Sequence, residues 1–397
     1  MNSDRWNLSV IVLLCVFLGA CKSDRPKSQI NVVVQHTKNL NYPENWSIDV
    51  LTFNTYTVPV LPPVRGERLK KAAKEIKSLN ADLIGLQEVF YDGSRDILKK
   101  LTGMKYGEYF SEPRTFGSGN FILSNSEMTK KTFWYHLLMG KMGRAEFYSG
   151  KGIAKTTIIH KELPVSFFNI HLLSRKGKDA DLYMDRDSID RMSELFEIFT
   201  QIVEQTDSDA FILAGDFNMN IYNREFNFFK NLTSLNGVTL QETDKKACTY
   251  CPENSFNKKS EGQLDYIWIS PRLKVKEHAV VLNEKHRIDG IRMNLSDHYG
   301  IKAKIIINQD LPLVKKEEAM NKSLQSISSL RIMLENELAS KNIDKGLEER
   351  FCRSCRLKDV LHIVKKYEKA LSKDQYELND NERSLSLRLK SYYNNFR

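Results

Sequence analysis

Short apolar runs alternate with stretches of helical periodicity along the first two thirds of the chain. The runs Ile48–Phe53 and Ala81–Val89 have the length and composition of buried strands. Between them, apolar residues recur at helical spacing from 69 to 79 among lysines. The pattern therefore predicts a strand–helix–strand unit.

A second unit repeats this plan further along the chain. Strands are predicted at Val165–Leu172 and Ala210–Gly215, and Ser188–Val203 between them has helical periodicity. Later strands are predicted at Leu264–Ile269 and Gly300–Ile307. Strands separated by helical segments indicate an α/β sandwich rather than a helical bundle or a pure β-barrel.

Polar residues stand at the ends of these predicted strands. A charged side chain after a buried apolar run is costly unless it lies at the mouth of the strand. We therefore expect these residues to converge at one edge, as in an active site. The residues are Asn54, Glu88, His171, Asp216 and the pair Asp297–His298 before the last strand.

The C-terminal region has a different pattern. Apolar residues follow 4/3 spacing from Met320 to Leu338, Gly346 interrupts the pattern, and helical spacing resumes from Val360 to Leu371. This predicts two or three amphipathic helices, packed on the domain or on a partner, in an extension over 311–397. A solvated helical extension is favoured over a binding module.

The start of the chain is predicted to be a targeting signal. Its apolar run from 8 to 18 is too short to span a bilayer as a stable helix. The ending Leu-Gly-Ala-Cys21 resembles a bacterial lipobox, which implies a signal peptide over 1–20 and a lipidated tether over 21–45. Anchoring in the bacterial cell envelope follows, with the outer membrane favoured by Lys22. An ordinary signal peptide or a chance apolar start are the alternatives.

Composition supports a folded protein with an anionic partner. Hydrophobic residues make up 41% of the 397 residues, which excludes wholesale disorder. The net charge of +10 suggests nucleic acid, a membrane surface or a phosphorylated substrate. Because residues 311–397 contribute half of this excess, the charge alone does not identify the partner.

Six segments in a fixed order over residues 50–307 carry a family resemblance. They are Leu-Thr-Phe-Asn54, Gly-Leu-Gln-Glu88-Val, Asn-Ile-His171-Leu, Ala-Gly-Asp216-Phe-Asn218, Leu-Asp265-Tyr-Ile-Trp and Leu-Ser-Asp297-His298. Together they resemble the endonuclease/exonuclease/phosphatase superfamily. The resemblance implies a DNase I-like four-layer α/β sandwich, with two β-sheets flanked by helices, as a catalytic domain over 46–310 that is followed by the helical extension.

The resemblance also implies Mg²⁺-assisted hydrolysis of a phosphodiester. Glu88 is expected to be the principal metal ligand, with Asn54 and Asp297 nearby, because Mg²⁺ prefers oxygen ligands. Mn²⁺ or Co²⁺ are expected substitutes. The metal neutralises the anionic phosphodiester and polarises its phosphoryl oxygen.

The remaining members of the set are expected to catalyse the reaction. His298 is the expected general base, because its ordinary pKa of about 6.5 lies near working pH, and Asp265 would fix its other nitrogen. Asp216 and Asn218 would orient the nucleophile and a phosphate oxygen. His171 would donate to the developing charge.

Two further stretches are similar to neutral sphingomyelinases. They are Gly117–Ser124 and the loop Glu146–Gly152, in which Lys151 would bind the substrate phosphate. Glu146 stands where that family usually has Asp, which leaves a regulatory acid–lysine pairing open. The alternative for the loop is a turn with a solvated lysine.

An aromatic and an apolar triplet lie just upstream of that loop. Phe133–Tyr135 and Leu137–Met139 are candidates for dipping into lipid, since a membrane-tethered lipid hydrolase must reach its substrate. The same pattern equally fits an amphipathic strand with buried neighbours.

Four cysteines remain after the signal and lipidation site are set aside. Cys248, Cys251, Cys352 and Cys355 form two Cys-x-x-Cys pairs, which could bind zinc or form disulfides within or between the pairs. Disulfides are favoured because an exported protein enters an oxidising compartment.

Three functions are compatible with these features of the sequence. The first is a phospholipase C type enzyme that hydrolyses sphingomyelin, or a related choline phospholipid in a membrane, to ceramide and phosphocholine. The second is a Mg²⁺-dependent secreted or surface nuclease on the same fold, with nucleic acid as substrate. The third is a lipid-anchored adhesin with a degenerate hydrolase fold, which the intact acidic and histidine set disfavours.

Overall fold

The structure is a computed structural model. It describes residues 43, 45–58, 65–111, 117–138, 149–174, 187–205, 208–237, 248–257, 261–309, 316–340, 353–373 and 377–394. The predicted signal peptide, Cys21, Glu146 and Cys352 lie outside these residues. Residues 39–397 form one compact unit. None of the helices in the described part of the chain combines the length and apolar character needed to cross a bilayer.

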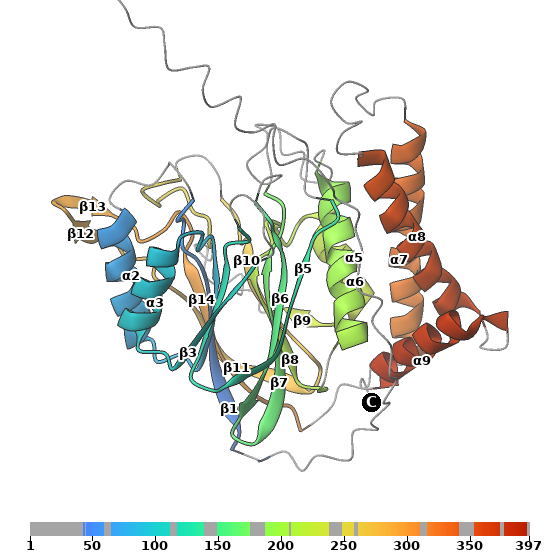
Figure 1. Ribbon diagram of the computed structural model, residues 1–397, viewed down its shortest axis with the longest axis horizontal. Helices are drawn as coiled ribbons and strands as arrows, with labels where there is room; N and C mark the ends of the chain where they lie inside the picture. The colour runs from blue at the N-terminus through green and yellow to red at the C-terminus, as the bar shows by residue number, and fades with distance from the viewer. Residues whose placement is uncertain are drawn as a thin grey trace, which may run out of the picture. The chain divides into compact units, whose positions relative to one another are not determined.

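Both predicted strand–helix–strand units are present, and each contributes a pair of parallel strands to the centre of its own sheet (Figure 1). In the first sheet, β1 pairs with β2, and in the second sheet β7 pairs with β8. The elements are β1 (Ser47–Asn54), α2 (Arg65–Ser78), β2 (Leu83–Gln87), β7 (Leu163–His171), α5 (Ser188–Gln205) and β8 (Phe211–Asp216).

Antiparallel strands complete both sheets. The first sheet has the order β11-β14-β1-β2-β4-β3 and the second has the order β5-β6-β7-β8-β10-β9. A two-stranded hairpin of β12 and β13 lies between β11 and β14 in sequence. The added strands are β3 (Tyr106–Phe110), β4 (Asn120–Ser124), β5 (Met128–Tyr135), β6 (Gly152–His160), β9 (Asn236–Gly237), β10 (Asp265–Ile269), β11 (Leu273–Val281), β12 (His286–Ile288), β13 (Ile291–Met293) and β14 (Gly300–Ile307).

The two sheets pack face to face between outer helices. Val50 from the first sheet and Phe167 and Ile212 from the second belong to one buried apolar cluster between the sheets. Helices α2 and α3 (Asp92–Thr102) cover the outer face of the first sheet, and α5 and α6 (Arg224–Thr233) cover that of the second. The predicted four-layer sandwich is confirmed.

Three C-terminal helices extend the layer outside the second sheet (Figure 1). They are α7 (Lys316–Ala339), α8 (Arg353–Ser372) and α9 (Asp380–Asn394). Ile327, Leu330 and Val364 are fully buried in the same cluster as Phe199 of α5. The predicted helices therefore pack on the domain. The solvated extension, which was favoured only over a binding module, does not describe these helices, because burying such apolar side chains against α5 and α6 is more favourable than exposing them to water.

The stretch that was a candidate for lipid contact is packed into the protein. Phe133 of β5 packs against the cluster between the sheets, and Trp134 and Leu137 pack against the cluster that contains α5. Leu138 is fully buried. Met139 lies outside the described residues. The described part of this stretch therefore fits the amphipathic strand with buried neighbours, and contact with lipid stays a prediction.

We expect the C-terminal helices to unfold together with the catalytic layers. Tyr367 of α8 is buried, its ring contacts Phe196, and its hydroxyl donates to Glu204 Oε1 at 2.7 Å. Tyr367→Ala should lower the free energy of unfolding by about 3–5 kcal/mol. The matched change Tyr222→Ala removes a tyrosine that is 61% exposed. It should change the free energy of unfolding by less than about 0.5 kcal/mol.

Denaturant unfolding followed by circular dichroism measures both changes. One transition that moves to lower denaturant in Tyr367→Ala is the expected result. An unchanged midpoint in that variant would mean that the C-terminal helices do not share the core of the domain.

Candidate functional site

Strand register brings three of the predicted residues into one row. His171 at the end of β7 pairs with Asp216 at the end of the parallel strand β8. Asp265, the first residue of the antiparallel strand β10, pairs with Asp216 on its other side. Asn54 closes β1 at the corresponding end of the first sheet. The predicted convergence of these strand ends therefore follows from the pairing of the strands.

Asp216 is the residue on which this group converges. Its Oδ2 accepts a hydrogen bond from Asn54 Nδ2 at 3.1 Å, and its Oδ1 accepts one from the Asn218 backbone N–H at 2.9 Å. Nε2 of His171 and Nε2 of His298 each lie 3.7 Å from Oδ2. Burial raises the pKa of Asp216 to about 6, with His298 opposing that shift.

His298 and Asp265 form the closest pair in the site. His298 Nδ1 lies 2.8 Å from Asp265 Oδ2, and both side chains are buried. Burial lowers the pKa of His298, but the carboxylates of Asp265 and Asp216 outweigh it and raise the pKa well above its usual range. The hydrogen bond fixes the ring so that Nε2 faces Asp216 and the row of strand ends.

His171 has the opposite electrostatic environment. Burial lowers its pKa well below the usual range, and the positive charges of Lys151 and His298 lower it further. Its Nε2 lies 4.0 Å from Glu88 Oε1, and its buried Nδ1 has no hydrogen-bond partner among the described residues. The site thus holds one histidine that favours the charged form and one that favours the neutral form.

Glu88 follows β2 with a backbone that side chains rarely adopt. Its φ is +60°, in the left-handed region, and Val89 N–H donates to the Gly119 carbonyl at 2.9 Å. Gly119 also has a positive φ, and a Cβ there would lie 3.0 Å from the Glu88 Cα. A glycine is therefore required at 119 for the loop to approach Glu88 this closely.

The burial of the Glu88 carboxyl group is only partly compensated, by the positive charges of Lys151 and His298 and by a hydrogen bond from Asn54. Oε2 has no hydrogen-bond partner in the described structure. Burial, followed by repulsion from Asp297, raises the pKa of Glu88 to about 7. Burial also raises the pKa of Asp297. A bound cation would satisfy the unpartnered oxygen and offset the repulsion between these carboxylates.

Two neighbouring sets of side chains, which share no residue, offer ligands for a divalent cation. Glu88, Asn54 and Asp297 offer the oxygen ligands that Mg²⁺ prefers. Asn54 Oδ1 already accepts the Tyr56 backbone N–H at 3.0 Å, which leaves one of its lone pairs available. In the second set, one ligand atom each from Asp216, Asp265 and His298 lies within 4.8 Å of the others.

Lys151 is buried beside the row rather than solvated. It is 6% exposed, and its Nζ donates to the Leu172 carbonyl at 3.0 Å. Asn218 Nδ2 donates to the same carbonyl at 3.0 Å. The alternative of a turn with a solvated lysine is therefore wrong. Its role in binding phosphate stays a prediction.

Two glutamates that the sequence did not single out hold the segments around Lys151. Glu194 of α5 accepts the Leu173 backbone N–H at 2.9 Å, just after the strand end that bears His171. Glu197 accepts the Leu137 backbone N–H at 3.1 Å and pairs with His136 Nδ1 at 2.9 Å. Burial raises the pKa of Glu194 to about 7. No sequence signal marks these residues, because acidic residues in a helix are ordinarily solvated.

Arg68 and Ser296 hold the loops at the strand mouths. The Arg68 guanidinium is buried and donates to the carbonyls of Thr55, Tyr56 and Leu295. Ser296 Oγ donates to the Asn54 carbonyl at 2.6 Å and accepts the His298 backbone N–H at 3.2 Å. These residues join the end of β1 to the segment that carries Asp297 and His298.

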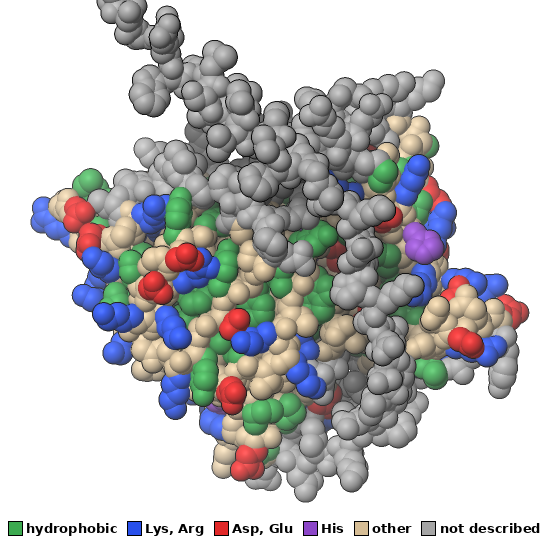
Figure 2. Space-filling model, viewed as in Figure 1, with side chains coloured by type: hydrophobic (Ala, Val, Ile, Leu, Met, Phe, Trp, Pro, Cys, Tyr) green, Lys and Arg blue, Asp and Glu red, His purple; other side chains and the backbone are tan. Residues whose placement is uncertain are grey.

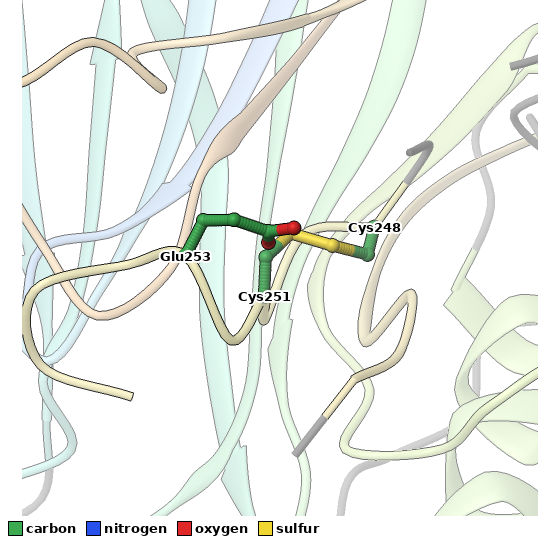
Figure 3. A group of neighbouring side chains, drawn as sticks. All are labelled: Cys248, Cys251 and Glu253. Carbon is green, nitrogen blue, oxygen red and sulfur yellow. A yellow bond between two sulfur atoms is a disulfide. The ribbon is translucent and has the colours of Figure 1, made fainter. Parts of the chain in front are cut away.

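The first Cys-x-x-Cys pair is a disulfide between Cys248 and Cys251 (Figure 3). Cys355 is also disulfide-bonded. The favoured prediction of disulfides is therefore confirmed at these residues. The alternatives of a four-cysteine zinc site and of a bond from Cys248 or Cys251 to the C-terminal pair are wrong, because the two sulfurs are joined to each other.

Comparisons with known proteins support the family resemblance. The model of the Endonuclease/Exonuclease/phosphatase family matches residues 51–298, more than half of the chain. A Drosophila melanogaster protein named "Putative neutral sphingomyelinase" is 24% identical over 276 residues, 65% of this chain and 60% of that protein. The "Inositol phosphosphingolipids phospholipase C" of Schizosaccharomyces pombe is 24% identical over 302 residues, 66% of this chain and 70% of that protein. The chain thus spans less than two thirds of the length of the Drosophila relative.

Solved structures share the fold. Beta toxin from Staphylococcus aureus has a TM-score of 0.54 and 20% identity, over 64% of this chain and 99% of the toxin chain. D. rerio TDP2 in complex with a single-strand DNA product has a TM-score of 0.51 and 18% identity, over 66% of this chain and 99% of that chain. With the family match over residues 51–298, these likenesses confirm the predicted resemblance, and the chain belongs to the endonuclease/exonuclease/phosphatase family.

Proposed function

We propose that the protein is a divalent-metal-dependent phosphodiesterase of phospholipase C type, which hydrolyses sphingomyelin or a related choline phospholipid. The observation that carries the phosphodiesterase is the arrangement of His298, Asp265 and Asp216 opposite His171 and Glu88. Two histidines with pKa values shifted in opposite directions, beside buried carboxylates, are suited to moving protons at an anionic centre.

The chain's own residues account for the proton transfer and the orientation of substrate. Asp265 holds Nδ1–H of His298. Because Asp265 and Asp216 favour the charged form of His298, the ring must first lose its Nε2 proton, and the positive charge of a bound cation would favour that loss. Neutral His298 then accepts a proton from the attacking water at Nε2. Asp216 and Asn218 orient that water and a phosphate oxygen. Neutral His171 donates a hydrogen bond to the charge that develops on the phosphoryl group.

The cation is assigned to Glu88, with Asn54 and Asp297 as further ligands. When bound, a divalent cation such as Mg²⁺ neutralises the phosphodiester and polarises its phosphoryl oxygen. In this assignment Asp216 does not bind the cation, because Asn54 and the Asn218 backbone N–H already donate to its two oxygens. Asp216 is therefore left to orient the water.

Two observations favour a lipid over a nucleic acid. The relatives from D. melanogaster and S. pombe carry the names of a sphingomyelinase and a phosphosphingolipid phospholipase C, and Lys151 lies buried beside the site in a stretch similar to neutral sphingomyelinases. The likeness to the TDP2–DNA complex rests on the fold alone. Lys and Arg side chains on the face in Figure 2 are interspersed with acidic ones, so the charge there favours neither substrate. The lipid anchor at Cys21 stays a prediction.

Paired assays on one preparation of the full chain test the substrate. We expect phosphocholine release from sphingomyelin liposomes with Mg²⁺ and none with EDTA, and no nicking of plasmid DNA under either condition. A His298→Ala preparation is the control for contaminating hydrolases. Nicking without phosphocholine release would move the substrate to nucleic acid, and inactivity in both assays with Mg²⁺, Mn²⁺ and Co²⁺ would contradict the proposed enzyme.

Cation binding should depend on pH through Glu88. Its pKa of about 7 means that the carboxyl is protonated below pH 7 and must lose that proton to bind a cation. The affinity for Mg²⁺ should therefore rise by up to about tenfold per pH unit below 7 and level off above it.

Calorimetric titration of the protein with Mg²⁺ between pH 5.5 and 8.5 measures this dependence. Glu88→Gln keeps the size of the side chain and should bind Mg²⁺ weakly at every pH. Wild-type affinity that does not change over this range, or tight binding by Glu88→Gln, would show that Glu88 is not the principal ligand.

A further inference from the structure

The disulfide between Cys248 and Cys251 encloses two residues that contact the catalytic pair. We call residues 248–251 the disulfide loop. Its cysteines are 5% and 2% exposed and pack with Tyr299, the residue after His298. The loop belongs to neither six-stranded sheet. It lies against the residues next to both Asp265 and His298.

Thr249 connects the backbone on both sides of the pair. Its buried Oγ1 accepts the backbone N–H groups of Leu264 at 2.9 Å and Asp265 at 3.2 Å. Its carbonyl accepts the Tyr299 backbone N–H at 2.7 Å. One residue thus spans the strand that begins with Asp265 and the segment that carries His298.

Tyr250 provides a second contact to the same pair. Its ring lies 5.0 Å from the His298 ring, centroid to centroid. Its backbone N–H donates to the Gly262 carbonyl at 3.0 Å, and its carbonyl accepts the Gly262 N–H at 3.2 Å. These bonds hold the loop against the segment that leads into β10, so the Tyr250 ring is fixed beside the imidazole.

We propose that the disulfide loop positions the His298–Asp265 pair, with Thr249 as the positioning residue and the disulfide as the covalent closure of the loop. The hydrogen bonds of Thr249 set the distance between two backbone segments, one with Asp265 and one with His298. These two residues are 33 positions apart in the sequence. A small change in that separation alters the hydrogen bond on which proton transfer depends. This inference rests on the proposed function, whichever phosphodiester the site cleaves.

Substitution of Thr249 tests the positioning role. Thr249→Val keeps the shape and removes the acceptor, and it should lower kcat by about 10- to 100-fold while KM changes by less than about threefold. Thr249→Ser keeps the hydroxyl and should restore most of kcat. Thr102→Val is the matched control, because Thr102 is also buried and its hydroxyl bonds a backbone carbonyl in α3, away from the site.

The outcomes of these variants separate positioning from general stability. Loss of kcat in Thr249→Val with rescue by Ser, and wild-type kcat in Thr102→Val, is the expected result. An unchanged kcat in Thr249→Val, or an equal loss in Thr249→Val and Thr249→Ser, would overturn the role of the hydroxyl. Cys248→Ser/Cys251→Ser should lower kcat by about tenfold or more, and wild-type turnover in that double variant would overturn the role of the disulfide.

Hydrogen exchange provides a readout that does not depend on the substrate. Amide protection in peptides that contain Leu264–Asp265 and Tyr299 should fall in Thr249→Val and in the double cysteine variant. If wild-type protein is inactive towards sphingomyelin and plasmid, the proposed function fails, and exchange alone decides this inference. Protection equal to wild type in both variants would overturn it.

Discussion

Burial of several carboxylates at the meeting edge of two sheets is the constraint on which the rest of this structure depends. Burial raises the pKa values of Glu88, Asp216 and Asp297, so the charged forms are costly unless neighbours stabilise them. Asn54 and the Asn218 backbone N–H donate to the two oxygens of Asp216, whereas Glu88 Oε2, like Asp265 Oδ1, has no hydrogen-bond partner among the residues that the structure describes. Glu88 therefore differs from Asp216 in retaining a buried oxygen that suits a cation.

The sheets can present this cluster because each contains a parallel pair that ends at the same edge. The Asn54–Asp216 hydrogen bond joins the pairs at the site. Deeper between the sheets, Gln87 Nε2 donates to Asn169 Oδ1 at 2.6 Å, and Asn169 Nδ2 donates to the Leu86 carbonyl at 2.9 Å. These buried hydrogen bonds fix how the two sheets face each other and therefore where the strand ends meet.

The sequence predicted the elements whose apolar pattern is strong and local. The central strands β2 and β8 are fully buried, so their apolar runs are continuous, and α5 shows clear helical periodicity. In contrast, β11 is an edge strand with mostly exposed residues and neither pattern. Asn54, Glu88, His171 and Asp216 were predicted because they follow buried strands, and Asp297 and His298 because they precede the last one. The family resemblance added Asn218 and Asp265. The sequence marks the cysteines on either side of Thr249 but not Thr249 itself. Its hydrogen bonds depend on tertiary contacts with residues far away in sequence.

The central claim is that Glu88, with Asn54 and Asp297, holds the divalent cation, and that Asp216, Asp265 and His298 are left for proton transfer. Anomalous diffraction from crystals soaked in Mn²⁺ tests it most directly. The account predicts one peak at about 2.1 Å from a Glu88 carboxylate oxygen. A peak bonded to His298 and Asp265, with none at Glu88, would contradict the assignment of both metal and base.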